Sequence, residues 1–245
     1  MYVTHRDQNK NLTEIPEDYD KEAGAPTLLD LQKNLITSIP KNALKNYKHS
    51  LRILNLQSNK LNSIDCSALN QVINIEWLNL SDNNLQFTSF KDKLSLPQLR
   101  HLDLSYNHIE HLPSIEACPK LEQFYSNHNN LSSLNNLAHK LPKTSLQVIH
   151  VCNNNFKDLT EIRYLTTFEQ LENLDLRGNS LVEKVKHSRC YILNWCLTVT
   201  KLNDFLASDD ECNKAEWLFT AVLGNQMGQF HISWDSYLIP WDKMG

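Results

Sequence analysis

"LRILNLQSNKL", residues 51–61, is one copy of the pattern L-x-x-L-x-L-x-x-N-x-L, which returns along most of this 245-residue chain. Further copies occupy residues 26–36, 75–85, 99–109, 121–131, 146–156 and 171–181, the last reading "LENLDLRGNSL". Their asparagines, at 34, 59, 83, 107, 129, 154 and 179, are 25, 24, 24, 22, 25 and 25 residues apart. Seven copies in a fixed register indicate an internal repeat.

The repeat determines the fold class. Its alternating L-x-L places leucines on one face of a short strand and the intervening residues on the other face. Its asparagine can satisfy backbone groups at the bend, and stacked copies would repeat that bond as a ladder. One unit cannot bury its leucines alone, whereas stacked units enclose a continuous core worth roughly 1.5 to 3 kcal/mol per enclosed Leu, Ile or Phe.

We therefore predict an α/β solenoid with a leucine-rich-repeat fold and a parallel sheet on its concave face. It comprises about seven units of 22–25 residues plus a degenerate N-terminal unit in "QNKNLTEIP", residues 8–16. Units this short leave room on the convex side only for turns, 3₁₀ pieces or short helices.

A C-terminal cap is predicted where the repeat stops, after Leu181. We expect a helix over residues 189–196, a last strand in "TVTKLNDF", residues 198–205, and a second helix that begins with Ser208 or Asp209 as N-cap. The solenoid would span residues 1–184 and the cap residues 185–245, packed together as one structural unit. The expected cap residues are Tyr191, Trp195, Leu202, Phe205, Trp217, Leu218 and Phe219. Residues 224–245 fit either a helix over the cap or a strand-like flap.

The concave face is the candidate binding surface, because the residues between the leucines are those a partner would meet. The residue inside each L-x-L forms one predicted row across the sheet: Asp30, Asn55, Asn79, Asp103, Tyr125, His150 and Asp175. With neighbouring positions, the predicted partner-binding residues are Trp77, His101, Asp103, Tyr106, Tyr125, His128, His150, Asp175 and Arg177. Aromatic groups ringed by polar ones are typical of protein-binding hot spots, although aromatic residues also favour strands intrinsically.

Composition and motifs exclude several other classes of function. A formal charge of −4, a pI near 6.2 and the lack of a basic run argue against nucleic acid as a partner. The first ten residues, MYVTHRDQNK, lack the apolar core of a signal peptide, and no apolar run is long enough to span a membrane. Six cysteines are scattered singly, which favours reduced, mostly buried thiols in an intracellular protein.

Metal binding and catalysis find little support in the same sequence. His101 and His150 are predicted to lie two strands apart, roughly 10 Å, which is too far to share one ion. No GxSxG, GxGxxG or phosphate-binding loop occurs. We therefore predict no metal, no cofactor, no small-molecule substrate and no enzymatic activity.

Two segments carry a family resemblance. Residues 189–205, a tyrosine-bearing helix followed by V-x-x-L-N-x-F, resemble the C-terminal cap of intracellular leucine-rich-repeat proteins such as the U2 small nuclear ribonucleoprotein A-prime and many ciliary and axonemal proteins. The segment "KAEWLF", residues 214–219, resembles the K-A-E-W-L-Y that follows the cap in the family of the ninety-seven-kilodalton centrosomal protein. Phe219 replaces the expected tyrosine, which indicates a diverged member.

The resemblance to the centrosomal family implies a scaffold at the distal end of the centriole, in the cytoplasm and cytoskeleton. It implies a coiled-coil capping protein as partner, restraint of centriolar microtubule growth and suppression of cilium assembly. We expect this chain to be an excerpt of a longer protein, and calmodulin would bind only through regions beyond it. The alternatives are a ciliary, axonemal or tubulin-associated adaptor and an A-prime-like ribonucleoprotein adaptor.

Overall fold

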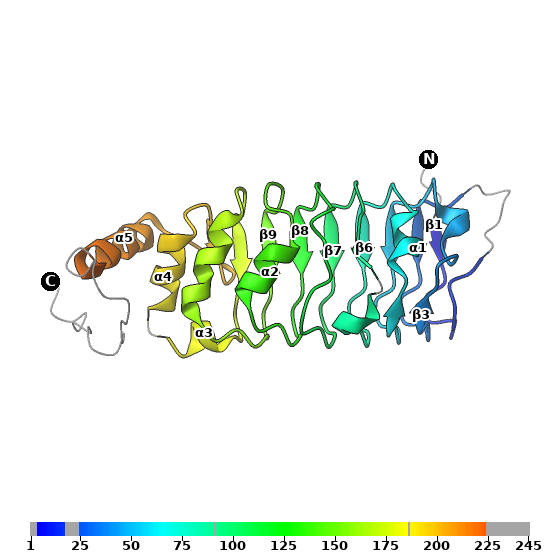
Figure 1. Ribbon diagram of the computed structural model, residues 1–245, viewed down its shortest axis with the longest axis horizontal. Coiled ribbons are helices and arrows are strands. Elements are labelled where there is room, and N and C mark those ends of the chain that lie inside the picture. Colours follow the sequence, from blue (N-terminus) through cyan, green and yellow to red (C-terminus); the bar gives the residue numbers. More distant parts are fainter. Residues whose placement is uncertain (1–3, 18–24, 91, 186, 224–245) are drawn as a thin grey trace.

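The structure is a computed structural model that describes residues 4–17, 25–90, 92–185 and 187–223 (Figure 1). Its main feature is one sheet whose strands lie side by side in chain order along the longest axis of the molecule, as Figure 1 shows. The strands are β1 (Thr4–Arg6), β2 (Leu28–Asp30), β4 (Ile53–Asn55), β6 (Trp77–Asn79), β7 (His101–Asp103), β8 (Gln123–Tyr125), β9 (Val148–His150), β10 (Asn173–Asp175), β11 (Lys201–Leu202) and β12 (Phe205–Leu206). All neighbouring pairs are parallel except β11 and β12, so the predicted leucine-rich-repeat solenoid is confirmed.

Short elements follow the strands on the other side of the core, as the short repeat predicts. A two-stranded parallel sheet joins β3 (Ser38–Ile39) to β5 (Ser63–Ile64). The helical pieces are η1 (Lys45–Tyr47), α1 (Cys66–Asn70), η2 (Phe87–Ser89), α2 (Leu134–Lys140), η3 (Leu159–Thr167) and α3 (Ser180–Glu183).

The core contains the central residue of each strand of the main sheet from β2 to β10, and Leu202 of β11 continues the row. These residues pair in register across the sheet, and each is 0% exposed: Leu29, Leu54, Leu78, Leu102, Phe124, Ile149, Leu174 and Leu202. Because side chains alternate along a strand, the residues on either side of this row face away from the core. We call that solvent-facing side of the sheet the concave face.

The repeated asparagines form the predicted ladder. Asn107 is typical: its Nδ2 donates to the carbonyl of Leu104 in its own repeat (3.0 Å) and of Leu80 in the previous one (3.1 Å). Its Oδ1 accepts the backbone N–H of Leu85 at 2.9 Å. The residue before each ladder asparagine has a left-handed backbone, with φ between 51° and 69°: Lys33, Ser58, Asp82, Tyr106, His128, Asn153 and Gly178.

Two helices and a hairpin form the C-terminal cap: α4 (Ser188–Trp195), β11 with β12, and α5 (Asp209–Leu223). Figure 1 shows α4 and α5 at the end of the solenoid opposite β1. Ser208 is the N-cap of α5, because its hydroxyl accepts the N–H of Glu211 and its own N–H donates to the Glu211 carboxylate, both at 3.2 Å. Arg189 ties the three pieces together, since it pairs with Glu211 at 2.9 Å and donates to the carbonyl of Leu202 at 2.7 Å.

The predicted single strand over residues 198–205 is wrong. Asn203 and Asp204 have φ of 54° and 67°, so the chain turns back and pairs β12 antiparallel to β11. Phe205 therefore lies on the hairpin beyond the turn with 70% of its surface exposed, and it does not pack in the cap as we expected.

The other cap residues differ in burial. Leu202 is fully buried, and the half-buried rings of Tyr191 and Trp195 lie 6.3 Å apart against the core. Trp217 is 50% exposed, whereas Ala215 on the same helix is buried, so α5 turns its small residue towards the cap. The side chains of Leu218 and Phe219, and residues 224–245, lie outside the described residues. The boundary at residue 184 stays a prediction.

All six cysteines are free thiols. Burial raises the pKa of the Cys118 thiol to about 11 and the pKa of the Cys196 thiol to about 12. These thiols are therefore neutral at ordinary pH and pack as small apolar side chains.

Candidate functional site

The register of the strands places the predicted surface row on the concave face. Each residue of this row pairs in register with the next one, in the order Asp30, Asn55, Asn79, Asp103, Tyr125, His150 and Asp175. A second row lies two residues earlier in each strand and contains Leu28, Ile53, Trp77, His101, Gln123, Val148 and Asn173. The variable residues of the repeat thus line the concave face in two rows, in which only Asn79 and Asp175 are buried.

Four aromatic rings from both rows form what we call the aromatic ladder: Trp77, His101, Tyr125 and His150. The centroids of Trp77 and His101 are 5.1 Å apart, with the planes inclined by 17°. His101 and Tyr125 follow at 5.0 Å, and Tyr125 meets His150 edge to face at 5.0 Å. These spacings follow from the distance of about 4.8 Å between neighbouring strands. Each such pair contributes about 0.5 to 1.5 kcal/mol beyond its burial.

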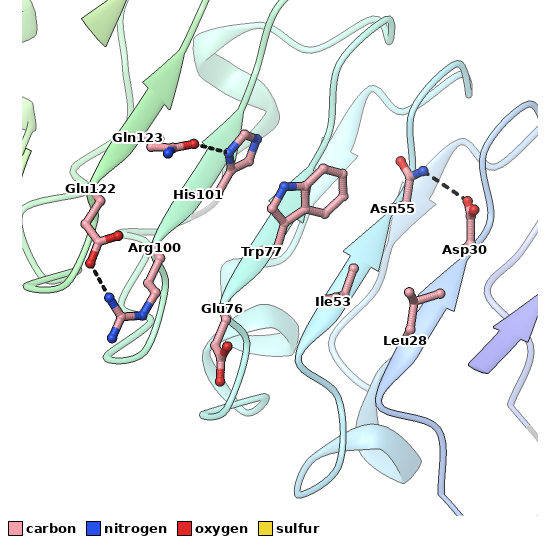
Figure 2. A pocket seen from close by; sticks show the side chains of 10 residues that line it. All are labelled: Leu28, Asp30, Ile53, Asn55, Glu76, Trp77, Arg100, His101, Glu122 and Gln123. Atoms are coloured by element: carbon pink, nitrogen blue, oxygen red, sulfur yellow. Dashed lines mark hydrogen bonds and ion pairs between the residues drawn. The ribbon is translucent and has the colours of Figure 1, made fainter. Parts of the chain in front are cut away.

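The rings of the aromatic ladder are partly buried, and one of them is held by a hydrogen bond. Nδ1 of His101 donates to Oε1 of Gln123 at 3.0 Å, which Figure 2 shows beside Trp77. Burial, followed by the negative charge of Asp103, raises the pKa of the Tyr125 hydroxyl. Nε2 of His150 is buried and has no hydrogen-bond partner among the described residues. The ladder is therefore a partly dehydrated surface with unused hydrogen-bonding capacity.

A second pair of rings lies at the rim of the concave face, in the bends that follow β7 and β8. We call Tyr106 and His128 the rim pair. Their rings stack at 4.3 Å with an interplanar angle of 12°, and Nδ2 of Asn153 donates to Nε2 of His128 at 3.1 Å. Tyr106 is 56% exposed at φ 55°, a backbone conformation that is unusual for a bulky residue. Such strain often accompanies functional sites.

Ion pairs occupy the opposite edge of the face and its C-terminal end. At the start of the strands, Arg52 pairs with Glu76, and Arg100 pairs with Glu122. Because each arginine meets a carboxylate from the next repeat, these pairs tie neighbouring repeats together and neutralise that edge. Exposed pairs of this kind contribute little to stability, up to about 1 kcal/mol each.

Asp175 differs from our expectation of a direct contact residue, whereas Arg177 is exposed and stays a predicted one. Nε of Arg177 donates to both carboxylate oxygens of Asp175 at 2.9 and 3.1 Å, and Arg177 also pairs with Asp204 of the cap hairpin. Burial raises the pKa of Asp175, but hydrogen bonds from Arg177 and Cys152 outweigh this effect and lower it overall. Asp175 is only 1% exposed, so it braces the last repeat against the cap and offers no surface to a partner.

A shallow groove of about 630 Å³ extends the aromatic ladder towards the N-terminal repeats (Figure 2). Its floor contains Leu28, Ile53 and Trp77, and Nδ2 of Asn55 donates to Oδ1 of Asp30 at 3.0 Å along its side. Our sequence prediction missed Leu28 and Ile53, although both occupy the same position in their repeats as Trp77. Collecting that position from every repeat would have found them.

The register also bears on the histidines. His101 lies on β7 and His150 on β9, two strands apart, as the sequence predicted. Within the part of the chain that the structure describes, no three His, Cys, Asp or Glu side chains gather in a way that could hold a metal ion. Among the described helices, none has the length and apolar character needed to cross a bilayer.

Comparison with known proteins supports the fold and the resemblance. The Leucine rich repeat family model matches residues 25–85 and, overlapping them, residues 49–109. The chain is 33% identical to the human (Homo sapiens) Centrosomal protein of 97 kDa over 117 residues, which are 45% of this chain and 13% of that protein. The mouse (Mus musculus) protein is 32% identical over the same shares. Lumican of Bos taurus is 29% identical over 136 residues, 54% of this chain and 38% of that protein.

These matches confirm the predicted resemblance to a diverged leucine-rich-repeat domain of the centrosomal protein's kind. The aligned part of the chain spans 13% of the length of the human and mouse centrosomal relatives. Lumican shares the similarity at a comparable identity, so the repeat pattern itself accounts for a share of each match.

Proposed function

We propose that this chain is a non-enzymatic protein-binding scaffold that acts at the centrosome and holds its partner on the concave face. The observation that carries the proposal is the aromatic ladder: four rings in contact across neighbouring strands, on a face turned away from the core. Large rings fixed by their neighbours lose little conformational freedom on binding, and for that reason aromatic residues dominate binding hot spots.

The centrosomal role rests on the similarity to the Centrosomal protein of 97 kDa, and the finer role rests on the family resemblance of the KAEWLF segment. On that basis we propose a coiled-coil capping protein of the centriole as the partner. Binding it would limit extension of centriolar microtubules and suppress cilium assembly. A solenoid suits such a partner, because its sheet presents a long surface along which an elongated chain can lie.

The test is capture of the purified capping partner by the immobilised chain. Changing Trp77, Tyr125 and His150 together to Ala should weaken capture at least tenfold, because it removes three rings of the ladder. Asn84, Lys157 and Glu169 are exposed and lie outside the sheet, so their triple Ala variant is the control and should capture normally. Unchanged capture by the ladder variant, with the fold intact by circular dichroism, would move the binding site elsewhere.

The location of a tagged copy separates the proposal from its alternatives. Enrichment at the end of the centriole supports it, whereas enrichment along the axoneme would favour a ciliary or tubulin-associated adaptor. A ribonucleoprotein adaptor would instead be retained on RNA with a steep dependence on salt, which the net charge of −4 argues against.

A further inference from the structure

The basic and acidic side chains of the concave face differ in their pairing. The arginines of the face, Arg52, Arg100 and Arg177, are each paired with carboxylates of the chain itself. In contrast, neither Asp82 nor Asp103 takes part in an ion pair within the described residues. Two carboxylates of the central repeats, Asp103 on the face and Asp82 at its rim, thus have no ion-pair partner in the part of the chain that the structure describes.

These carboxylates come from the same or neighbouring repeats as the rings. Asp82 and Tyr106 occupy equivalent bends one repeat apart, because each comes directly before the ladder asparagine of its repeat, Asn83 or Asn107. Asp103 lies in β7, three residues before Tyr106, and pairs in register with Tyr125. Asp103 and Tyr106 therefore belong to one repeat and His128 to the next, so the rim pair and Asp103 lie within two adjacent repeats.

A guanidinium group satisfies this combination better than other ligands. Its flat faces stack on aromatic rings, while its edge donates two parallel hydrogen bonds to a carboxylate. A lysine ammonium is a compact and strongly hydrated point charge that gains less from a ring face. A phosphorylated or acidic partner would meet Asp82 and Asp103 as like charges, and a purely apolar partner would leave the carboxylates dehydrated without a counter-charge.

We propose that the rim pair and Asp103 form a site for an arginine side chain of the partner protein, flanked by the aromatic ladder. The inference rests on the proposed function, because it specifies what the concave face recognises. An exposed tyrosine in a left-handed conformation, stacked on His128, gives a ring face held ready for the guanidinium. Asp103 supplies the charge, and Asp82 adds to the negative potential from the previous repeat.

Other repeats of the chain show which substitutions at Asp103 and Tyr106 keep the local structure. Oδ1 of Asp103 accepts the N–H of Ser105 at 2.8 Å, and Asn79 accepts the N–H of Ser81 at the same distance from the equivalent position. Asp103→Asn therefore removes the charge and keeps the local bond. Tyr106→Asn places at the left-handed position the residue that Asn153 already provides two repeats later. Both variants should fold normally.

The binding test uses the isotopically labelled chain and three small probes, the Nα-acetyl N-methylamides of arginine, lysine and citrulline. In NMR titrations the arginine probe should shift the signals of residues 103, 106 and 128, with a dissociation constant at least fivefold below that of either other probe. Asp103→Asn and Tyr106→Asn should each weaken arginine binding at least fivefold. Glu169→Gln, an exposed carboxylate outside the sheet, is the control and should have no effect.

Three outcomes would overturn the inference: equal binding of arginine and lysine, arginine binding unaffected by Tyr106→Asn, or stronger shifts from acetyl-glutamate or inorganic phosphate. The capture assay with the capping partner separates this failure from failure of the proposed function. If the ladder variant loses capture while Tyr106→Asn and Asp103→Asn retain it, the scaffold function stands and the arginine site is wrong. If all the variants capture normally, the concave face is not the binding surface.

Discussion

Asn83 and Asn84 are adjacent residues of the same type, and the structure predicts opposite consequences for their replacement by Ala. The Asn83 side chain is 6% exposed and makes four hydrogen bonds. Its Nδ2 donates to the carbonyls of Leu56, Leu80 and Ser81 at 3.0 to 3.1 Å, and its Oδ1 accepts the N–H of Leu61 at 2.9 Å.

Replacing Asn83 by Ala should lower the free energy of unfolding by less than the loss of four independent hydrogen bonds would. The reason is that neighbouring residues also donate to the carbonyl groups that Asn83 uses. The carbonyl of Leu56 also accepts from Asn59 at 3.0 Å, and the carbonyl of Leu80 also accepts from Asn107 at 3.1 Å. The carbonyl of Ser81 retains the N–H of Ser58 at 3.0 Å.

Only the buried N–H of Leu61 loses its recorded partner when Asn83 becomes Ala. An orphaned buried donor costs about 1 to 3 kcal/mol. The three weakened carbonyl contacts add about 0.5 kcal/mol each, so Asn83→Ala should lower the free energy of unfolding by about 3 kcal/mol.

Equilibrium unfolding in urea, followed by far-ultraviolet circular dichroism, measures this difference. The Asn84 side chain is exposed, so Asn84→Ala should change the free energy of unfolding by no more than about 0.5 kcal/mol. Because each repeat depends on its neighbours, the Asn83 variant should also show a lower slope if the solenoid unfolds in parts. Equal decreases in the free energy of unfolding for Asn83→Ala and Asn84→Ala would refute the asparagine ladder as the source of stability.

Two further predictions concern stability. The free energy of unfolding should fall between pH 9 and pH 10.5 in denaturant titrations. Burial raises the pKa of Cys118 to about 11 and those of Cys152 and Cys196 to about 12, while the unfolded thiols ionise near 9.0. Their contribution is complete below pH 9.0 and is lost as pH rises towards the folded values, at up to about 1.4 kcal/mol per pH unit per thiol; a flat profile would contradict it. In thermal melts, Leu202→Ala should lower the Tm more than Trp217→Ala, since Leu202 is 0% and Trp217 50% exposed; the reverse order would show that Trp217 holds the cap.

The repeat made the core and the surface row predictable from sequence, because one period fixes both the inward leucines and the residues between them. Ser126 shows where this reasoning ends. It stands where most other repeats have a leucine, yet it is 0% exposed, and its hydroxyl accepts a hydrogen bond from Asn129 at 3.2 Å. The neighbouring Phe124, also 0% exposed, occupies a leucine position with a larger side chain. The pattern places both residues inward but does not give their contacts.

The cap and the charged residues were harder to predict, because their outcome depends on competition between local preferences. The alternation of "TVTKLNDF" favours one strand, whereas Asn203 and Asp204 tolerate the left-handed conformation that a two-residue hairpin requires. The turn prevails and exposes Phe205. Likewise, the row position of Asp175 suggested a contact residue, but Arg177 in the following bend covers it.

The differences between repeats locate function better than their shared residues do. Leucines and asparagines recur because the core and the ladder require them, so they carry no information about a partner. At the left-handed position before the ladder asparagine, most repeats have small or flexible polar residues that adopt it at little cost, such as Ser58 and Asn153. Tyr106 and His128 break that rule in two successive repeats and stack on each other. Asp103 forms no ion pair among the described residues and lies in the first of those repeats, and this coincidence of strain and charge is what supports our proposal of a recognition site there.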